Sequence, residues 1–182
     1  MPGFYYADNY FVISVQLKPH PSTPASMVRG VNVEISRAAD ILALRYCLTG
    51  KLAALCIPQP GPPQRTDNLW QHCCFEIFIR QTQQTAYDEY NFSPSRQWAH
   101  YHFNDYRAGE SQPDTPAPQI TVLQQPNQLS LITHITIPTG LVQINLSTVL
   151  EDENGNLSYW ALHHPLEKAD FHHSDAFILE LE

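Results

Sequence analysis

The 182-residue chain has little positive charge. Its 10 Lys and Arg residues compare with 18 Asp and Glu residues, so the formal net charge is −8 at pH 7. Nonspecific binding to nucleic acid or to an anionic membrane needs basic patches, and the acidic excess argues against both partners. No apolar run approaches the roughly 18 residues of a membrane span. Residues 1–20 also lack the basic region, apolar run and cleavage site of a signal peptide, so we expect a cytoplasmic protein.

Cysteine is scarce, and its placement does not suggest a disulfide framework. The four cysteines are Cys47, Cys56, Cys73 and Cys74. Cys73 and Cys74 are adjacent on a predicted strand, so their side chains point to opposite faces and are poorly placed to share one metal ion. A Cys47–Cys56 disulfide is the alternative to the simpler expectation, which is four free thiols in a reducing compartment.

Helical periodicity is almost absent, and alternating runs rich in Val, Ile, Tyr, Phe and Thr take its place. These runs predict strands near 10–18, 30–37, 41–49, 72–80, 86–92, 97–103, 119–125, 128–137, 142–149, 157–163 and 175–181. One short helix or turn is expected near 139–148. The Pro- and Ser-rich stretches 20–26 and 108–118 are predicted loops. Many short strands without helical crossovers predict one all-β domain over 1–182, an antiparallel sandwich or barrel.

The strand predicted over 72–80 carries a carboxylate among apolar residues. Strand alternation places Cys73, Phe75, Ile77 and Ile79 on one face, which we interpret as the core face. Glu76 then lies on the opposite face, where a carboxylate needs a partner. An Arg or His in a structural ion pair and a bound ligand both remain open as that partner.

Two segments carry a resemblance to a known family. The runs LWQHCCFEIFIR and YDEYNFSPSRQWAHY resemble the bacterial DOMON-like proteins, which belong with the family-nine carbohydrate-binding modules. The segments SYWALHHP and DFHHSDAFILEL are similar to the end of the same family, so the resemblance spans roughly 12–181. Arg96 departs from the pattern, because the family usually has Gly in this turn. The resemblance implies a jelly-roll type β-sandwich whose relatives bind sugars or haem.

A sugar site needs flat rings against the C–H faces of the sugar and polar groups for its hydroxyls. We predict that Trp70 and Trp160 flank one ligand pocket. Glu76, Arg65 and Asn91 are the predicted hydrogen-bonding partners, and His163 and His172 are predicted at the rim. Large aromatic residues also fill sandwich cores. For Trp70 and Trp160 both interpretations stay open, while Trp98 is expected to pack.

The remaining polar residues point to no reaction and no cofactor. Among nine histidines, only His100 and His102 share a strand face at close spacing, which makes a metal site the weaker hypothesis. Met27 is the one internal Met available as a haem ligand. No catalytic motif is present, and Asp88–Glu89 is interpreted as solvated charge. We predict a non-catalytic domain that binds a small carbohydrate or related polar molecule; the alternatives are a structural or protein-interaction domain and a haem-binding redox module.

Overall fold

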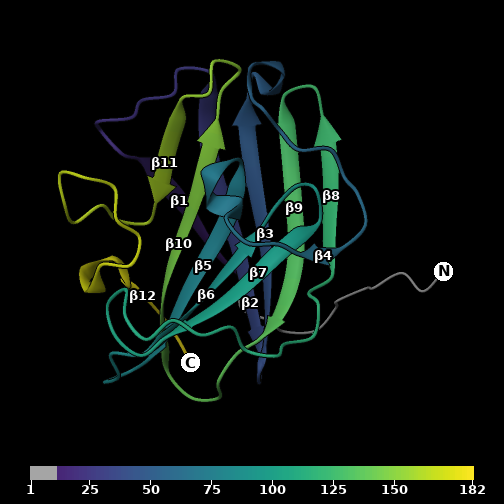
Figure 1. Cartoon of the computed structure of the whole chain (residues 1–182). Helices are drawn as coiled ribbons and strands as arrows, with labels where there is room; N and C mark the ends of the chain where they lie inside the picture. The colour runs from purple at the N-terminus through teal and green to yellow at the C-terminus, as the bar shows by residue number, and fades with distance from the viewer. Residues whose placement is uncertain (1–11) are drawn as a thin grey trace.

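The computed structural model describes residues 12–182, which form strands joined by short 3₁₀ turns (Figure 1). The strands are β1 (Ile13–Pro19), β2 (Val28–Ala38), β3 (Ile41–Gly50), β4 (Gln64–Arg65), β5 (Cys74–Gln81), β6 (Tyr87–Phe92), β7 (Gln97–Phe103), β8 (Ile120–Gln125), β9 (Gln128–Thr136), β10 (Val142–Glu151), β11 (Leu157–Ala161) and β12 (Leu179–Leu181). The turns are η1 (Leu52–Ala54), η2 (Leu69–Gln71) and η3 (Ser174–Ala176).

Each strand predicted from the sequence has a counterpart, so the all-β prediction is confirmed. The strand predicted from residue 10 begins at Ile13, and residues 10 and 11 lie outside the described part of the chain. The expectation of a helix or turn over 139–148 is wrong beyond residue 141, because β10 starts at Val142 and its alternate residues enter the core. No helix within residues 12–182 is both long enough and apolar enough to cross a membrane.

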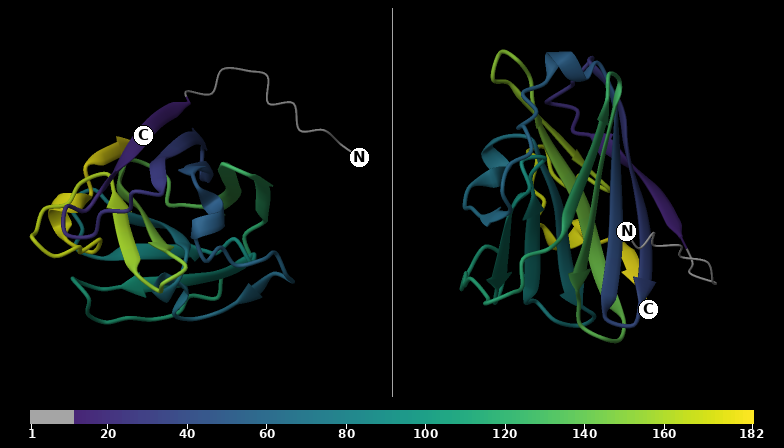
Figure 2. Two further views of the ribbon diagram at one scale, coloured as in Figure 1. Left: turned by 90° about the horizontal axis from the view of Figure 1, so that it is seen from above. Right: turned by 90° about the vertical axis from the view of Figure 1, so that its right-hand side faces the viewer.

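The strands form two layers of one curled sheet, which the right-hand view of Figure 2 shows edge-on. The first layer has the order β1-β2-β3-β9-β8, and the second has the order β4-β7-β6-β5-β10-β11-β1, with β12 also paired to β10. β1 joins them, because its residues 13–17 pair with β2 while Lys18 and Pro19 pair with β11. Neighbouring strands are antiparallel except β4, which runs parallel to β7.

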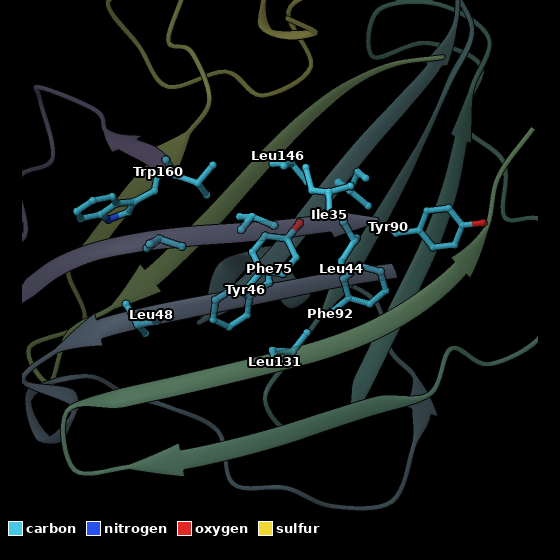
Figure 3. Packing of buried hydrophobic residues seen from close by; sticks show 14 of the residues in the cluster. Ile35, Leu44, Tyr46, Leu48, Phe75, Tyr90, Phe92, Leu131, Leu146 and Trp160 are labelled. Carbon is cyan, nitrogen blue, oxygen red and sulfur yellow. The ribbon is translucent and has the colours of Figure 1, made fainter. Parts of the chain in front are cut away.

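The main core lies between the two layers and takes residues from strands of both, some of which Figure 3 shows. On β5 the inward residues are Phe75, Ile77 and Ile79, so the core face predicted for this strand is correct. Tyr46 reaches the core from β3, where its hydroxyl donates to the Glu76 carbonyl oxygen at 2.7 Å.

The outer face of the second layer is also covered. A second apolar cluster forms there, with Phe78, Tyr87, Ala99, Tyr101, Phe103, Val149, Ala161, Phe171 and Phe177 as its buried members. The segment between β11 and β12, yellow in Figure 1, contributes Phe171 and Phe177 to this cover. The middle strand β5 is therefore buried on both faces, which explains why its sequence is an almost continuous apolar run.

The turn between β6 and β7 holds one residue in the left-handed conformation. Arg96 adopts φ 71°, the left-handed conformation that residues with a Cβ rarely occupy. The backbone N–H of Arg96 donates to the Ser93 carbonyl oxygen at 2.9 Å, which closes the turn. The sequence departure at this position thus leaves the hairpin intact.

Candidate functional site

A cavity of about 640 Å³ opens on the outer face of the second layer. Strands β5, β6, β7, β10 and β11 provide its floor, and three loop segments provide its walls. The lining residues are Asp67, Asn68, Trp70, Glu76, Phe78, Glu89, Tyr101, Phe103, Arg107, Glu110, Gln112, Val149, Tyr159, Ala169, Phe171 and His172. A volume of this size accommodates a small organic ligand.

Short-range backbone pairing holds the walls in place. The first wall follows β4, which is paired with β7. The chain then turns at Asn68, whose φ is 61°. This turn places Trp70 at the rim, with 46% of its surface exposed. The second wall folds back on β7, because His102 and Ser111 exchange backbone hydrogen bonds of 2.9 and 2.8 Å. That exchange positions Glu110 and Gln112 beside the cavity.

Polar residues form a row across the floor. Glu76 on β5 is directly opposite Asn91 on β6 and directly opposite Ser147 on β10, so the three side chains lie on one face. The Ser147 hydroxyl donates to Glu76 Oε2 at 2.9 Å. Asn91 Nδ2 donates to Glu89 Oε1 at 2.9 Å, so the second floor carboxyl is held beside this row.

Both floor carboxyls are buried and have raised pKa values. Glu76 and Glu89 are 2% and 5% exposed. Burial raises the pKa of Glu76, and the negative charge of Glu89 raises it further. Burial also raises the pKa of Glu89, against the opposing effects of the Asn91 hydrogen bond and of the positive charge on Arg107. Both carboxyls therefore retain their protons to a higher pH than exposed glutamates do.

His172 does not neutralise these carboxylates. Burial and the nearby Arg107 charge lower the pKa of His172 to about 4, so its ring is neutral near pH 7. Its Nδ1 lies 2.8 Å from the Tyr87 hydroxyl, and its Nε2 lies 3.7 Å from Glu89 Oε2. The Tyr87 oxygen accepts the Arg107 backbone N–H at 3.2 Å, so the Tyr87 hydroxyl can donate its own proton to His172 Nδ1. The neutral His172 ring then carries its proton on Nε2.

The one guanidinium in the lining already has an anionic partner. Arg107 Nη2 lies 3.0 Å from Asp170 Oδ1, and the Arg107 hydrogen bond helps to keep the Asp170 pKa low. At the opposite wall Asp67 Oδ1 accepts the Tyr101 hydroxyl at 2.8 Å and the Gln112 amide at 3.3 Å. The lining thus combines aromatic rings with an excess of carboxylates.

The structure brings three of the seven predicted site residues together in this cavity. Trp70, Glu76 and His172 line it. Asn91 is fully buried and reaches the site only through Glu89. Arg65 lies outside the lining, where its guanidinium is 5.8 Å from the centre of the Tyr101 ring and donates to the His100 carbonyl oxygen at 2.9 Å.

Trp160 and His163 are not in the cavity lining. Trp160 is 5% exposed, and its ring packs in the main core, as Figure 3 shows. Its Nε1 donates to the Ser158 hydroxyl at 3.2 Å. The neighbouring Tyr159 points to the opposite face of β11 and lines the cavity, so a clamp between Trp70 and Trp160 is not formed. Trp98 is buried in the main core, as expected.

Glu89 is the principal residue that sequence reasoning missed. The interpretation of Asp88–Glu89 as solvated charge is wrong, because Glu89 is buried in the cavity floor and Asp88 contacts two histidines. Asp88 Oδ1 lies 2.9 Å from His100 Nε2 and 3.2 Å from His102 Nδ1. The alternation of Glu89 with Asn91, opposite Glu76, was the available signal.

The alternatives based on metal and haem gain no support from the geometry. Within residues 12–182 no group of three or more His, Cys, Asp or Glu side chains is arranged to hold a metal ion. Met27 packs against the main core, away from the cavity lining. The four cysteines are free, and Cys73 and Cys74 are both buried.

Comparison with protein-family models and with curated proteins found no match. Among solved structures, the fold is similar to a crystal structure from Bacteroides uniformis, whose protein is described as a "putative carbohydrate-binding protein". The TM-score is 0.70 and the sequence identity is 11%, over 91% of this chain and 84% of the other. At this identity the likeness establishes the fold, an all-β sandwich-like architecture.

Proposed function

We propose that the chain is a DOMON-like domain that binds a small carbohydrate in the cavity on the outer face of its second layer. The observation that carries the proposal is the combination at this one place of an exposed indole and buried hydrogen-bonding groups. Trp70 offers a flat apolar surface at the rim, while Glu76 and Glu89 offer acceptors at the floor. Sugars present apolar C–H faces edged by hydroxyls, which is the complementary pattern. The similar fold of a protein described as carbohydrate-binding supports this assignment.

The two floor carboxylates favour binding over glycoside hydrolysis. Hydrolysis requires one carboxyl group on each side of the scissile bond, as acid and as base or nucleophile. Glu76 and Glu89 come from the adjacent strands β5 and β6 and project from the same sheet face. We propose that these two carboxyls bind hydroxyls of the ligand rather than flank a scissile bond, and that the domain is non-catalytic.

The test measures how the exposed indole contributes to ligand binding. β-1,4-linked tetrasaccharides are titrated by calorimetry into the wild-type protein and then into the Trp70→Ala variant. Loss of a stacked ring should weaken binding by about 1–3 kcal/mol, by analogy with truncated binding hot spots. Leu123→Ala is the control, because Leu123 is 55% exposed on β8 of the other layer.

Tryptophan fluorescence provides a second readout. Trp98 and Trp160 are each 5% exposed, so a ligand-induced change in emission should come from Trp70 and should disappear in Trp70→Phe. Unchanged affinity in a folded Trp70→Ala protein would place any sugar site elsewhere. If a broad glycan screen yields no ligand at all, the structural or protein-interaction alternative replaces this proposal.

A further inference from the structure

Three buried side chains in or behind the cavity floor have an oxygen atom without a hydrogen-bond donor. Glu76 Oε1, Asn91 Oδ1 and Asn145 Oδ1 are buried and have no hydrogen-bond partner. The amide orientations are fixed, because Asn91 Nδ2 donates to Glu89 and Asn145 Nδ2 donates to the Phe171 carbonyl oxygen at 3.0 Å. Both amide oxygens are therefore acceptors, and Glu76 Oε1 is an acceptor once its carboxyl, whose pKa is raised by burial, has lost its proton. A ligand that satisfies the floor must bring donors.

Glu76 is the member of this set that reaches the cavity. It lines the cavity although it is 2% exposed, and its strand neighbours on the same face provide no cation. The titratable groups around it are Glu89 on β6, Cys74 on its own strand and Tyr46 on β3, and burial raises the pKa of both the Cys74 thiol and the Tyr46 hydroxyl. Among the covering segments, Arg107 is paired with Asp170 and His172 is neutral near pH 7.

The lining as a whole is acidic. Asp67, Glu76, Glu89 and Glu110 contribute carboxyl groups, and Arg107 is the one Lys or Arg in the lining. An aqueous cavity lined by one sign of charge concentrates ions of the opposite sign. A protonated primary amine matches both properties, because it carries one positive charge and three donors and accepts no hydrogen bond.

We propose that the ligand is an amino sugar with a free, protonated amine, and that the Glu76 and Glu89 carboxylates hold its ammonium group at the cavity floor. The inference rests on the proposed carbohydrate function and names the class of sugar. Trp70 at the rim then stacks on the sugar ring, while the ammonium group fills the place where the floor lacks donors.

The test uses three tetrasaccharides that share one β-1,4-linked glucose backbone and differ at carbon 2: a free amine, an N-acetyl group or a hydroxyl. Each is titrated by calorimetry into the full chain at about pH 6, where a primary amine is protonated. The free-amine tetramer should bind at least tenfold more tightly than the other two, a difference of about 1.4 kcal/mol. In Glu76→Gln this preference should fall to twofold or less, because the free-amine tetramer should lose more affinity than the hydroxyl tetramer does.

Glu34→Gln is the matched control, because Glu34 is half-exposed on β2 and pairs with Arg45 on the other layer. It should keep the full preference for the free amine. Heats measured in two buffers of different ionisation enthalpy give a second readout, since a bound ammonium should displace protons from the floor carboxyls.

The outcomes separate the inference from the function on which it rests. If the hydroxyl or N-acetyl tetramer binds as tightly as the free amine, the amino-sugar inference is overturned and carbohydrate binding stands. If Glu76→Gln keeps the preference while it remains folded, Glu76 does not hold the amine, and the inference is again overturned. If none of the three tetramers and no other glycan binds, both are overturned.

Discussion

The substitution Glu76→Gln should make the protein more stable at alkaline pH and leave its stability nearly unchanged in mild acid. Gln has the shape of a protonated Glu and can still accept the Ser147 hydroxyl that lies 2.9 Å from Glu76 Oε2. It cannot ionise. The variant therefore removes the cost of a buried negative charge and keeps most of the packing around it.

The sign follows from the raised pKa of Glu76. Between the unfolded-state pKa and the folded-state pKa, the native protein binds more protons than the unfolded chain, so the free energy of unfolding falls as pH rises through that window. Each unit of pKa difference is worth about 1.4 kcal/mol once the pH exceeds both values. The Ser147 hydrogen bond and the opening of the cavity to water reduce the cost of the charge, and we expect a gain of about 2–3 kcal/mol near pH 9.

Urea unfolding, followed by tryptophan fluorescence at about pH 5, 7 and 9, measures this gain. The difference between Glu76→Gln and the wild type should increase at each step. The exposed Glu34→Gln substitution should show a difference that stays flat with pH, since water solvates that carboxylate. A Glu76→Gln protein that is no more stable than the wild type near pH 9 would refute the reasoning, because it would mean that the buried carboxyl ionises without cost.

Three further measurements test other parts of the structure. Trp160→Ala should destabilise the protein by about 3–5 kcal/mol in thermal or urea unfolding, because it empties a large volume of the main core; a loss below about 1 kcal/mol would contradict its core position. A thiol reagent should modify the exposed Cys56 first and all four cysteines after denaturation without reductant, and the loss of two thiols would indicate a Cys47–Cys56 disulfide. His172→Gln should reduce the loss of stability between about pH 6 and pH 4, because the native ring, with its pKa lowered to about 4, binds its proton at a lower pH than the unfolded chain does. An unchanged dependence of stability on pH would show that His172 is protonated without cost.

The fold was predictable from the sequence because most strands are short runs rich in β-branched and aromatic residues, separated by turn signals, and helical periodicity is almost absent. On β5 the alternation of Phe75, Ile77 and Ile79 with Glu76 assigned both faces correctly. The face of β11 was not predictable in the same way. Tyr159 and Trp160 are both large aromatic residues, and a shift of one residue exchanges the cavity face with the core face.

Glu89 shows a second limit of sequence reasoning. In β6, polar and aromatic residues occur on both faces, with Tyr87 and Glu89 outward and Asp88 and Tyr90 inward. Alternation of hydrophobicity therefore did not separate a buried carboxylate from a solvated one. Its burial depends on segments distant in sequence, such as Phe171 and Phe177, which cover this face of the sheet. The residues near Glu89 in the sequence do not indicate that these distant segments bury it.

The buried carboxylates connect stability with binding. A floor of Ser, Asn and Gln could hydrogen-bond a neutral sugar and would not place two acidic groups against each other in a poorly solvated site. The negative charge of Glu89 raises the cost of ionising Glu76 in the empty cavity. An ammonium group between them would offset the repulsion and satisfy the open acceptor of Glu76, so the same charges that weaken the empty domain would strengthen the complex. Selectivity for an amine over a hydroxyl would then arise from the penalty that the empty site carries, since a hydroxyl leaves the two carboxylates uncompensated.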